Sequence, residues 1–352
     1  ATGNGLAANV IANDAWTNTT ANPVNVVYTV VPVSASGCQG NPQTVTITVN
    51  PEPVLANLNT TKCSDEPLGF NLSVAAGSVA ASTYNITAIN SNGLTASAGS
   101  PATGTLLPAN VIADDSWTNT TPSSVNVIYT VVPVSSNGCA GNPRTITITV
   151  NPEPVMATPG STKCSREPLG FNLSVNAGGV AAASYNITSI NANGLTASAG
   201  SPAPGSLLPA NIIADDAWIN TTSSIVNVVY TVVPVSAAGC QGNPATITIA
   251  VKPEPVITAG QSVTSCSGNP LNYAVAVDNF INPAGGVTFT WPAPVLNPSS
   301  PSFTGGSARS VASPANITDT FMNTLGVVGT ATYNITPYKD GCAGLPVTVV
   351  IN

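Results

Sequence analysis

The chain has 352 residues, enough for about two to four domains. Only 6% of its residues are charged, it contains no histidine, and its net charge is −7. The seven Lys and Arg are scattered, so they cannot neutralise a row of phosphates, and a nucleic-acid partner is excluded. No run of about 18 apolar residues is present, which excludes a membrane span. A hydrophobic content of 43% is also too high for a disordered chain.

The predicted elements are all strands, and they follow one another closely. Short strands are expected over Gly69 to Ala75 and over Thr83 to Ile89, and Asn92-Gly93 supplies a turn after the second. Val125 to Val134 is longer and more apolar, as expected for a central strand. Thr145 to Val150 alternates strictly, which predicts that its Ile and Val residues face a core and its Thr residues face solvent. Helical periodicity does not persist anywhere, so the fold class is all-β.

An internal repeat organises the chain. The segment Ala8 to Trp16 returns as Ala109 to Trp117 and as Ala210 to Trp218, in steps of 101 residues. This period fits one immunoglobulin-like Greek-key β-sandwich. Because Ile351-Asn352 matches Val49-Asn50, residues 51–151, 152–252 and 253–352 are predicted to be complete repeats, and 1–50 the C-terminal half of another.

The joints between repeats carry a Pro-Glu-Pro sequence directly after the last strand, at residues 51–53, 152–154 and 253–255. Proline holds the backbone extended and stiff. We therefore expect the repeats to be arranged as an elongated rod.

Seven cysteines recur with the repeat, and two pairings respect its period. The first joins Cys63–Cys139, Cys164–Cys240 and Cys266–Cys342, each 76 residues apart, and leaves Cys38 unpaired. The second joins Cys38–Cys63, Cys139–Cys164 and Cys240–Cys266 and leaves Cys342 unpaired.

Geometry favours the first pairing. In the second, the intervening segment contains a full strand and a stiff linker, whereas a disulfide needs Cα atoms within about 7 Å. The first pairing requires residues 53–62 to lie near Cys139 as a short lead-in segment. It also places the partner of Cys38 before Ala1. Regular disulfides indicate an extracellular or cell-surface location.

Residues that might carry chemistry are few. Without histidine, a Ser-His-Asp triad is excluded. Asp114-Asp115 and Asp215-Asp216 are adjacent carboxylates, but neighbours on an extended chain point in opposite directions, so they do not predict a catalytic dyad. We expect Asp14, Asp115, Asp216 and Asp319 to cap a turn beside a buried aromatic residue. Asp115 and Asp216 are weak calcium candidates, and no other cofactor is expected.

Four motifs occur in order with regular spacing: Asp115-x-Trp117-x-Asn119-Thr120, Tyr129-Thr130-Val131-x-Pro133, Gly138-Cys139-x-Gly141 and Val150-Asn151-Pro152-x-Pro154. The third repeat diverges from them, with Phe321 where the others carry Trp. With Cys266-Ser267-Gly268 these motifs resemble the PKD-like repeat of Bacteroidota surface proteins. Cys63-Ser64-Asp65 and Cys164-Ser165-Arg166 depart from that last motif because they lack its glycine.

The resemblance implies a long extracellular protein, of the kind exported by type IX secretion, that serves as a gliding adhesin or surface filament. The expected function is the non-catalytic shaft of such an adhesin or filament, which self-associates or contacts surface glycans and other cells. The alternative is a spacer or carbohydrate-binding array attached to a secreted enzyme. An exposed row of aromatic residues would favour that alternative, but the four Trp residues are expected in the core.

Overall fold

A computed structural model of the chain describes residues 2–280, 286–313 and 316–352. Every regular element in these ranges is a β-strand, as expected, and none of the described segments is a helix that could cross a membrane. The chain divides into two compact units. Unit 1 is Ala1–Val155 with Ala177–Ala181 and Ser236–Gln241, and unit 2 is Met156–Asn176, Ala182–Val235 and Gly242–Asn352.

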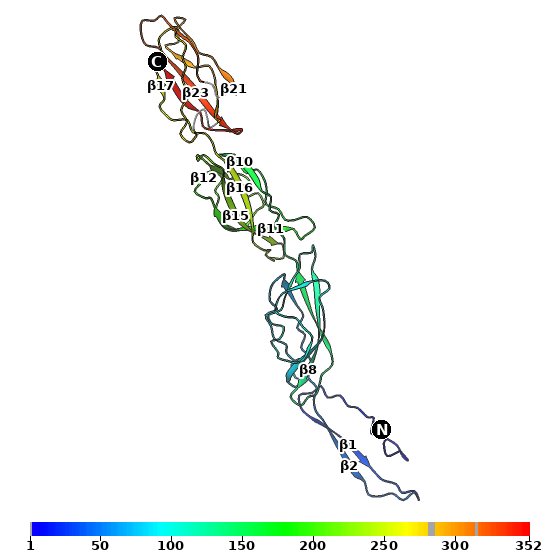
Figure 1. Cartoon of the computed structure of the whole chain (residues 1–352). Helices are drawn as coiled ribbons and strands as arrows, with labels where there is room; N and C mark the ends of the chain where they lie inside the picture. Colours follow the sequence, from blue (N-terminus) through cyan, green and yellow to red (C-terminus); the bar gives the residue numbers. More distant parts are fainter. Residues whose placement is uncertain (1, 281–285, 314–315) are drawn as a thin grey trace. The chain divides into compact units, whose positions relative to one another are not determined.

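Unit 1 contains one complete sandwich (Figure 1). Its larger sheet has the strand order β3-β9-β8-β4-β6, and its second layer contains the pair β5-β7. The strands are β3 (Thr60–Cys63), β4 (Ala81–Asn90), β5 (Thr95–Ala98), β6 (Gly104–Leu107), β7 (Ser116–Thr118), β8 (Val125–Ser135) and β9 (Arg144–Asn151). The β3–β9 pair is parallel, and the remaining pairs are antiparallel. This confirms the immunoglobulin-like fold class.

The strand patterns explain the core. In β9, Ile146, Ile148 and Val150 are buried while the threonines between them are more exposed, which confirms the predicted alternation. β8 lies between β9 and β4, so it is central as expected, and Val127, Tyr129 and Val131 are fully buried on it.

Two shorter expectations had different outcomes. Asn92 and Gly93 both have positive φ, as the predicted tight turn requires. Gly69 to Ala75 does not form a strand. It runs alongside residues 109–115 and is held there by irregularly spaced backbone hydrogen bonds, including one from Leu72 N–H to the Ala109 carbonyl. Much of the second layer consists of such irregular segments.

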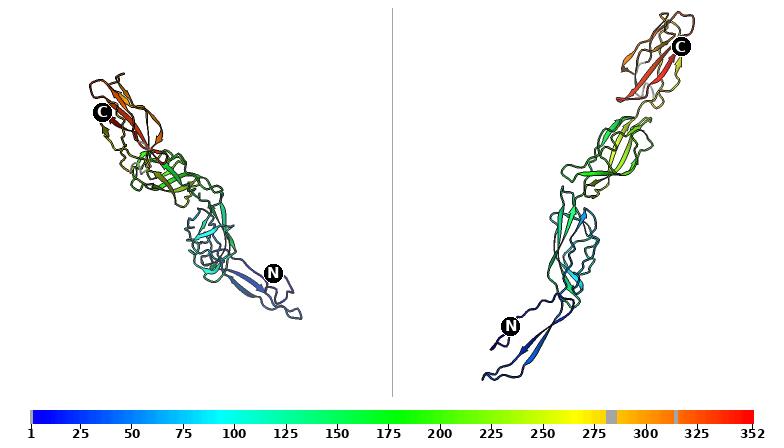
Figure 2. Two further views of the ribbon diagram at one scale, coloured as in Figure 1. Left: turned by 45° about the horizontal axis from the view of Figure 1, so that its top comes forward. Right: turned by 180° about the vertical axis from the view of Figure 1, so that it is seen from behind.

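The N-terminal part of unit 1 is a two-stranded hairpin of β1 (Val24–Val30) and β2 (Gln43–Val49). Its register repeats that of β8 with β9: Tyr28 is opposite Val45, as Tyr129 is opposite Ile146. Figure 2 shows the hairpin from two further directions, with no second layer of strands against it. The described residues up to Asn50 thus form one pair of strands, and their assignment as the C-terminal half of a repeat stays a prediction.

Unit 2 contains two further sandwiches. One has the sheet order β10-β16-β15-β11-β13 with the pair β12-β14. It is built from β10 (Ser161–Cys164), β11 (Ala182–Asn191), β12 (Thr196–Ala199), β13 (Gly205–Leu208), β14 (Ala217–Ile219), β15 (Val226–Ser236) and β16 (Ala245–Lys252). The other has the order β17-β25-β23-β18-β21 with the pair β20-β22. Its strands are β17 (Ser262–Val263), β18 (Thr288–Trp291), β19 (Val295–Asn297), β20 (Phe303–Gly305), β21 (Arg309–Ser313), β22 (Phe321–Asn323), β23 (Thr330–Lys339), β24 (Cys342–Ala343) and β25 (Val347–Ile351).

Three separate hydrophobic cores draw their buried residues from 55–150, 156–251 and 257–351. Each core therefore lies inside one expected repeat. The exact boundaries and the rod arrangement stay predictions.

Candidate functional site

Asp115, which the sequence singles out, is the last acceptor in a buried chain of hydrogen bonds. The indole N–H of Trp117 donates to the hydroxyl of Tyr129 at 3.1 Å, and that hydroxyl donates to Asp115 Oδ2 at 2.8 Å. Trp218, Tyr230 and Asp216 repeat the arrangement with the same two distances. The aspartate thus does more than cap a turn, because it satisfies a tyrosine hydroxyl in the core.

This chain of contacts is suited to structure rather than chemistry. Asp115 is fully buried while Asp114 is exposed, so the adjacent carboxylates do point in opposite directions. Burial raises the pKa of Asp115, and it raises the pKa of Asp216 to about 6. Among the described residues no group of three or more acidic, Cys or His side chains is placed to hold a metal. A single buried carboxylate that already binds a tyrosine hydroxyl does not fit calcium, which needs several oxygen ligands.

The tryptophans have different environments. Trp117, Trp218 and Trp291 are between 4% and 6% exposed, as expected for core residues. Trp16 is 52% exposed, so the expectation of a buried aromatic residue there is wrong. The reason is that residues 1–50 provide only one half of a sandwich.

The cysteines pair differently from the prediction. The structure joins Cys63 to Cys240 and Cys164 to Cys342, and Cys38, Cys139 and Cys266 are free. The predicted pairs Cys63–Cys139, Cys164–Cys240 and Cys266–Cys342 are therefore wrong, and only the free state of Cys38 agrees.

The parallel pairing of β3 with β9 gives the physical reason. Pro53 lies at the end of the sandwich that holds Cys139, since a Cβ at Gly141 would be 1.9 Å from the Pro53 carbonyl oxygen. The chain then runs the length of the sandwich, and Cys63 lies opposite Asn151 at the end of β9. Cys139 precedes β9, so its eight residues separate the two sulfurs by roughly 25 Å. Residues 53–62 are therefore not a short lead-in segment.

The observed bridges are staggered along the chain. The first cysteine of one repeat bonds the hairpin cysteine of the following repeat, with separations of 177 and 178 residues. Each bridge is thus a second covalent connection across a Pro-Glu-Pro joint.

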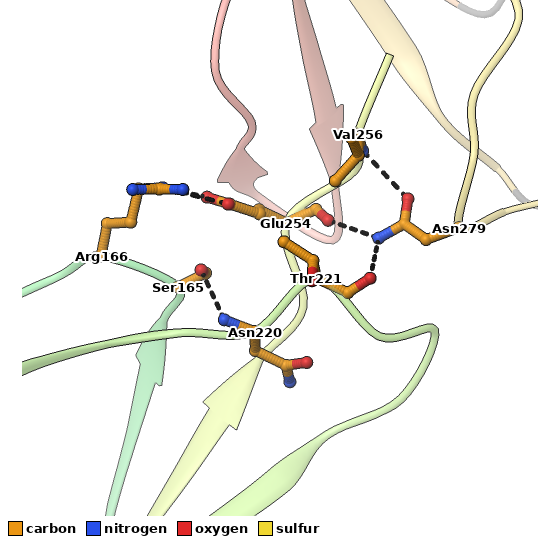
Figure 3. A network of polar contacts seen from close by, with 7 residues as sticks. All are labelled: Ser165, Arg166, Asn220, Thr221, Glu254, Val256 and Asn279. Atoms are coloured by element: carbon orange, nitrogen blue, oxygen red, sulfur yellow. Dashed lines mark hydrogen bonds and ion pairs between the residues drawn. The ribbon is translucent and has the colours of Figure 1, made fainter. Parts of the chain in front are cut away.

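A polar network surrounds the joint after β16, within unit 2 (Figure 3). Arg166 Nε donates to both carboxylate oxygens of Glu254, at 2.8 and 3.0 Å, and the Glu254 side chain is only 2% exposed. The Asn279 side-chain amide donates to the backbone carbonyls of Glu254 and Thr221, and it accepts from the Val256 N–H. A residue of the third repeat therefore fastens the joint to the second repeat.

The equivalent place in unit 1 has the opposite charge. Asp65 occupies the position of Arg166, and Glu153 that of Glu254. Burial and the neighbouring Asp65 carboxylate raise the pKa of Glu153 to about 7. Burial alone would also raise the pKa of Asp65, but hydrogen bonds from Thr118, Ser97 and Glu153 hold it below its usual value. In unit 1 the buried glutamate is neutralised by a proton on Glu153, whereas in unit 2 it is neutralised by the Arg166 guanidinium.

This position also explains a departure from the family motif. Asp65, Arg166 and Gly268 all have positive φ, at 62°, 67° and 83°. The backbone N–H of each residue donates to a backbone carbonyl of the strand beside it, and the acceptors are Trp117, Trp218 and Phe321 respectively. The left-handed conformation favours glycine, so the first two repeats accept backbone strain in exchange for a charged side chain.

Sequence reasoning missed the tyrosine of the buried chain and the charged side chains at the joints. The tyrosine had a signal, because Asp, aromatic residue and Tyr recur with constant spacing at 115, 117 and 129 and at 319, 321 and 333. The sequence also shows that Asp65 stands where the next repeat has Arg166. It does not show that Glu153 is the neighbour of Asp65, since no local pattern brings residue 65 beside residue 153.

Comparison with known proteins supports the repeat assignment. The profile of the PKD-like domain matches four times, at residues 1–53, 60–154, 161–255 and 263–352. No curated protein sequence matches significantly.

Solved structures with some likeness include an I-band fragment of titin (10% identity, TM-score 0.31, covering 86% of this chain and 96% of that one). Another is Drosophila N-cadherin EC1-3 (10%, 0.22, 86% and 99%). A third is the Bacteroides ovatus mixed-linkage glucan utilization locus protein SGBP-B with a heptasaccharide (15%, 0.19, 86% and 71%).

Proposed function

The chain belongs to the PKD-like domain family along almost its whole length, and from this premise we propose that it is the non-catalytic shaft of a secreted bacterial surface adhesin or extracellular filament. The observation that carries the proposal is the staggered pair of disulfides, Cys63–Cys240 and Cys164–Cys342. A bridge inside one sandwich would stabilise that sandwich alone. A bridge to the next repeat also limits how far the chain can extend when one of the repeats unfolds.

The rest of the chain's chemistry supports a structural role. The carboxylates with raised pKa values are buried and already have a neighbour, which is a tyrosine hydroxyl for Asp115 and Asp216 and the Asp65 carboxyl group for Glu153. Disulfides also fit an extracellular location. Histidine, the residue best suited to proton transfer near neutral pH, does not occur in the chain.

Self-association into a filament or bundle is part of the same proposal. With 6% charged residues, neighbouring chains repel each other only weakly. Leu106 and Leu207 occupy equivalent positions in two repeats, are about 70% exposed, and have left-handed backbone conformations. Exposed apolar side chains on strained backbone, at the same place in successive repeats, are features of contact sites.

Stretching single molecules of the full chain tests the proposed role as a shaft. With both bridges closed, the shortest covalent path from end to end omits most of the residues between Cys63 and Cys342. We expect the oxidised chain to reach less than half the extension of the reduced chain before it detaches. Equal extensions in the two states would contradict the proposal. The double variant Cys63→Ser/Cys240→Ser is the matched control: it should extend only slightly further than the oxidised chain, because Cys164–Cys342 alone already bypasses the residues between them.

A further inference from the structure

The half sandwich at residues 2–50 leaves a core face uncovered. Within the described residues, β1 and β2 pair only with each other, whereas β8 also pairs with β4 and β9 also pairs with β3. Side chains that are buried at equivalent positions of the first complete repeat are open here: Val30 (44% exposed), Val33 (55%), Val45 (41%), Ile47 (38%) and Trp16 (52%), against Val131 (0%), Val134 (8%), Ile146 (0%), Ile148 (0%) and Trp117 (6%).

This face already has the geometry of a finished repeat. Trp16 donates to the Tyr28 hydroxyl at 3.0 Å, and Tyr28 donates to Asp14 at 2.8 Å, as in the buried chain of Trp117, Tyr129 and Asp115. Asn18 is buried and donates to the Val49 carbonyl, as Asn119 does to Val150. A binding partner would therefore meet a preformed surface, which lowers the entropic cost of association.

The complete repeats show what covers such a face. In unit 1, residues 54–107 place β3 along β9 and β4 along β8, and they bury Leu55, Tyr84 and Ile86 against the core. We infer that the face of residues 2–50 binds the first half of a further repeat, a polypeptide segment with the sequence pattern of residues 54–107. The pairing would be β-strand addition at both edges of the hairpin.

A free cysteine stands where this segment would end. By the register of β3 with β9, the cysteine of the docked segment would lie opposite Asn50, at the start of the Pro51–Pro53 joint. The hairpin of Cys139 packs on that joint, since Asn142 donates to the Glu52 carboxylate and Gly141 contacts Pro53. This is the relation that Cys63 has to Cys240, one repeat later in the chain. The docked segment's cysteine and Cys139 therefore form the next bridge of the staggered series.

The bond needs an oxidant, which is a small disulfide such as oxidised glutathione. The segment's thiolate attacks it and releases one glutathione thiol. The Cys139 thiolate then attacks the mixed disulfide at the segment's sulfur and releases the second. Two protein thiols are oxidised to one disulfide, and one small disulfide is reduced to two thiols.

The test uses the full chain and a synthetic peptide of residues 54–107 in a glutathione redox buffer. We expect reversible binding with a blue shift of Trp16 fluorescence, which a Trp16→Phe variant should lack. Mass spectrometry without reduction should find the peptide's Cys63 bonded to Cys139 of the chain. The Cys139→Ser variant should lose the adduct but keep reversible binding, while Cys38→Ser should keep both.

Two neighbouring substitutions make matched controls. Ile47→Asp places a charge on the uncovered face and should weaken binding by at least about tenfold, because the carboxylate would be buried without a partner. Thr46→Asp, on the opposite side of β2, should change binding little. A peptide of residues 155–208, from the second repeat, is a second probe and should bind as well.

Several results would overturn the inference. One is the absence of binding by both peptides, and another is equal binding by the Ile47→Asp and Thr46→Asp variants. Adducts spread equally over Cys38, Cys139 and Cys266 would also contradict it. If the chain alone sediments as a dimer in which Trp16 is already buried, a second copy covers the face instead.

Discussion

The ends of the first and second complete repeats share one backbone arrangement and differ in charge. Both bury a glutamate in the Pro-Glu-Pro joint, Glu153 in one and Glu254 in the other. The second is neutralised by Arg166, whereas the first faces Asp65. Their neighbours differ accordingly, since Asp65 accepts a hydrogen bond from Thr118, and the second repeat has Ile219 at that place. The comparison teaches that a glutamate buried at this place can be compensated either by a cation or by a proton.

The largest expected effect comes from removing the cation. The Arg166→Met variant leaves Glu254 buried without a partner, and we expect the second repeat to lose roughly 3 kcal/mol, since breaking such a pair is costly even though Arg166 is partly exposed. Hydrogen exchange of peptides from β15 and β16 measures this loss, and β8 and β9 of the same molecule serve as the reference. The double variant Arg166→Met/Glu254→Gln should recover most of the stability. Unchanged protection in the single variant would show that the pair contributes little.

The stability of the first repeat should depend more strongly on pH than that of the second. The pKa of Glu153 is raised from 4.5 to about 7 by folding, so the folded state retains a proton that the unfolded state loses. Its stabilising effect is complete below about pH 4.5 and is lost as pH rises through 7, by an amount on the order of 3 kcal/mol.

Opening free energies from hydrogen exchange, corrected for intrinsic rates, should therefore fall more for β8 and β9 than for β15 and β16 between pH 5 and pH 8. Burial also raises the pKa values of Asp115 and Asp216, so titration of these aspartates lowers the stability of both repeats with rising pH, and the buried Glu153 is the group that distinguishes the first repeat. Parallel curves for the two repeats would contradict the assignment.

A smaller effect should follow from replacing the acidic neighbour of Glu153 with a cation. The Asp65→Arg variant supplies Glu153 with a guanidinium, and we expect a gain of about 2 kcal/mol in the first repeat at pH 8 and almost none at pH 5. The same exchange experiment measures it. Asp65→Asn is the control: it removes the like charge without adding a cation, so it should recover only part of the gain. An equal gain at both pH values would mean that charge is not the cause.

The fold could be predicted from the sequence because its signals are local and repeated. The alternation in β9 and the apolar run of β8 specify which side chains face the core, and the recurrence of Trp16, Trp117 and Trp218 specifies the size of the unit. The first two signals can be read within one repeat, and the third needs only a comparison of successive repeats.

The disulfide pairing and the acid pair could not be predicted, because they depend on which end of a sandwich a residue reaches. The spacing of 76 residues within a repeat is as regular as the spacing of 177 between repeats, so periodicity alone does not choose between them. The choice depends on the parallel pairing of β3 with β9, which carries Cys63 away from Cys139 and Asp65 toward Glu153. Short strands such as β3, with four residues, leave little trace in a sequence.

The overlap of the two bridges gives the chain a tolerance to proteolytic cleavage. The interval from Cys63 to Cys240 and the interval from Cys164 to Cys342 share residues 164–240. Hydrolysis of any one peptide bond between Cys63 and Cys342 therefore leaves both fragments attached through sulfur. Within the shared stretch, two bridges hold them. Where proteases are present, this chain would remain in one piece after a cut that severs an ordinary string of domains.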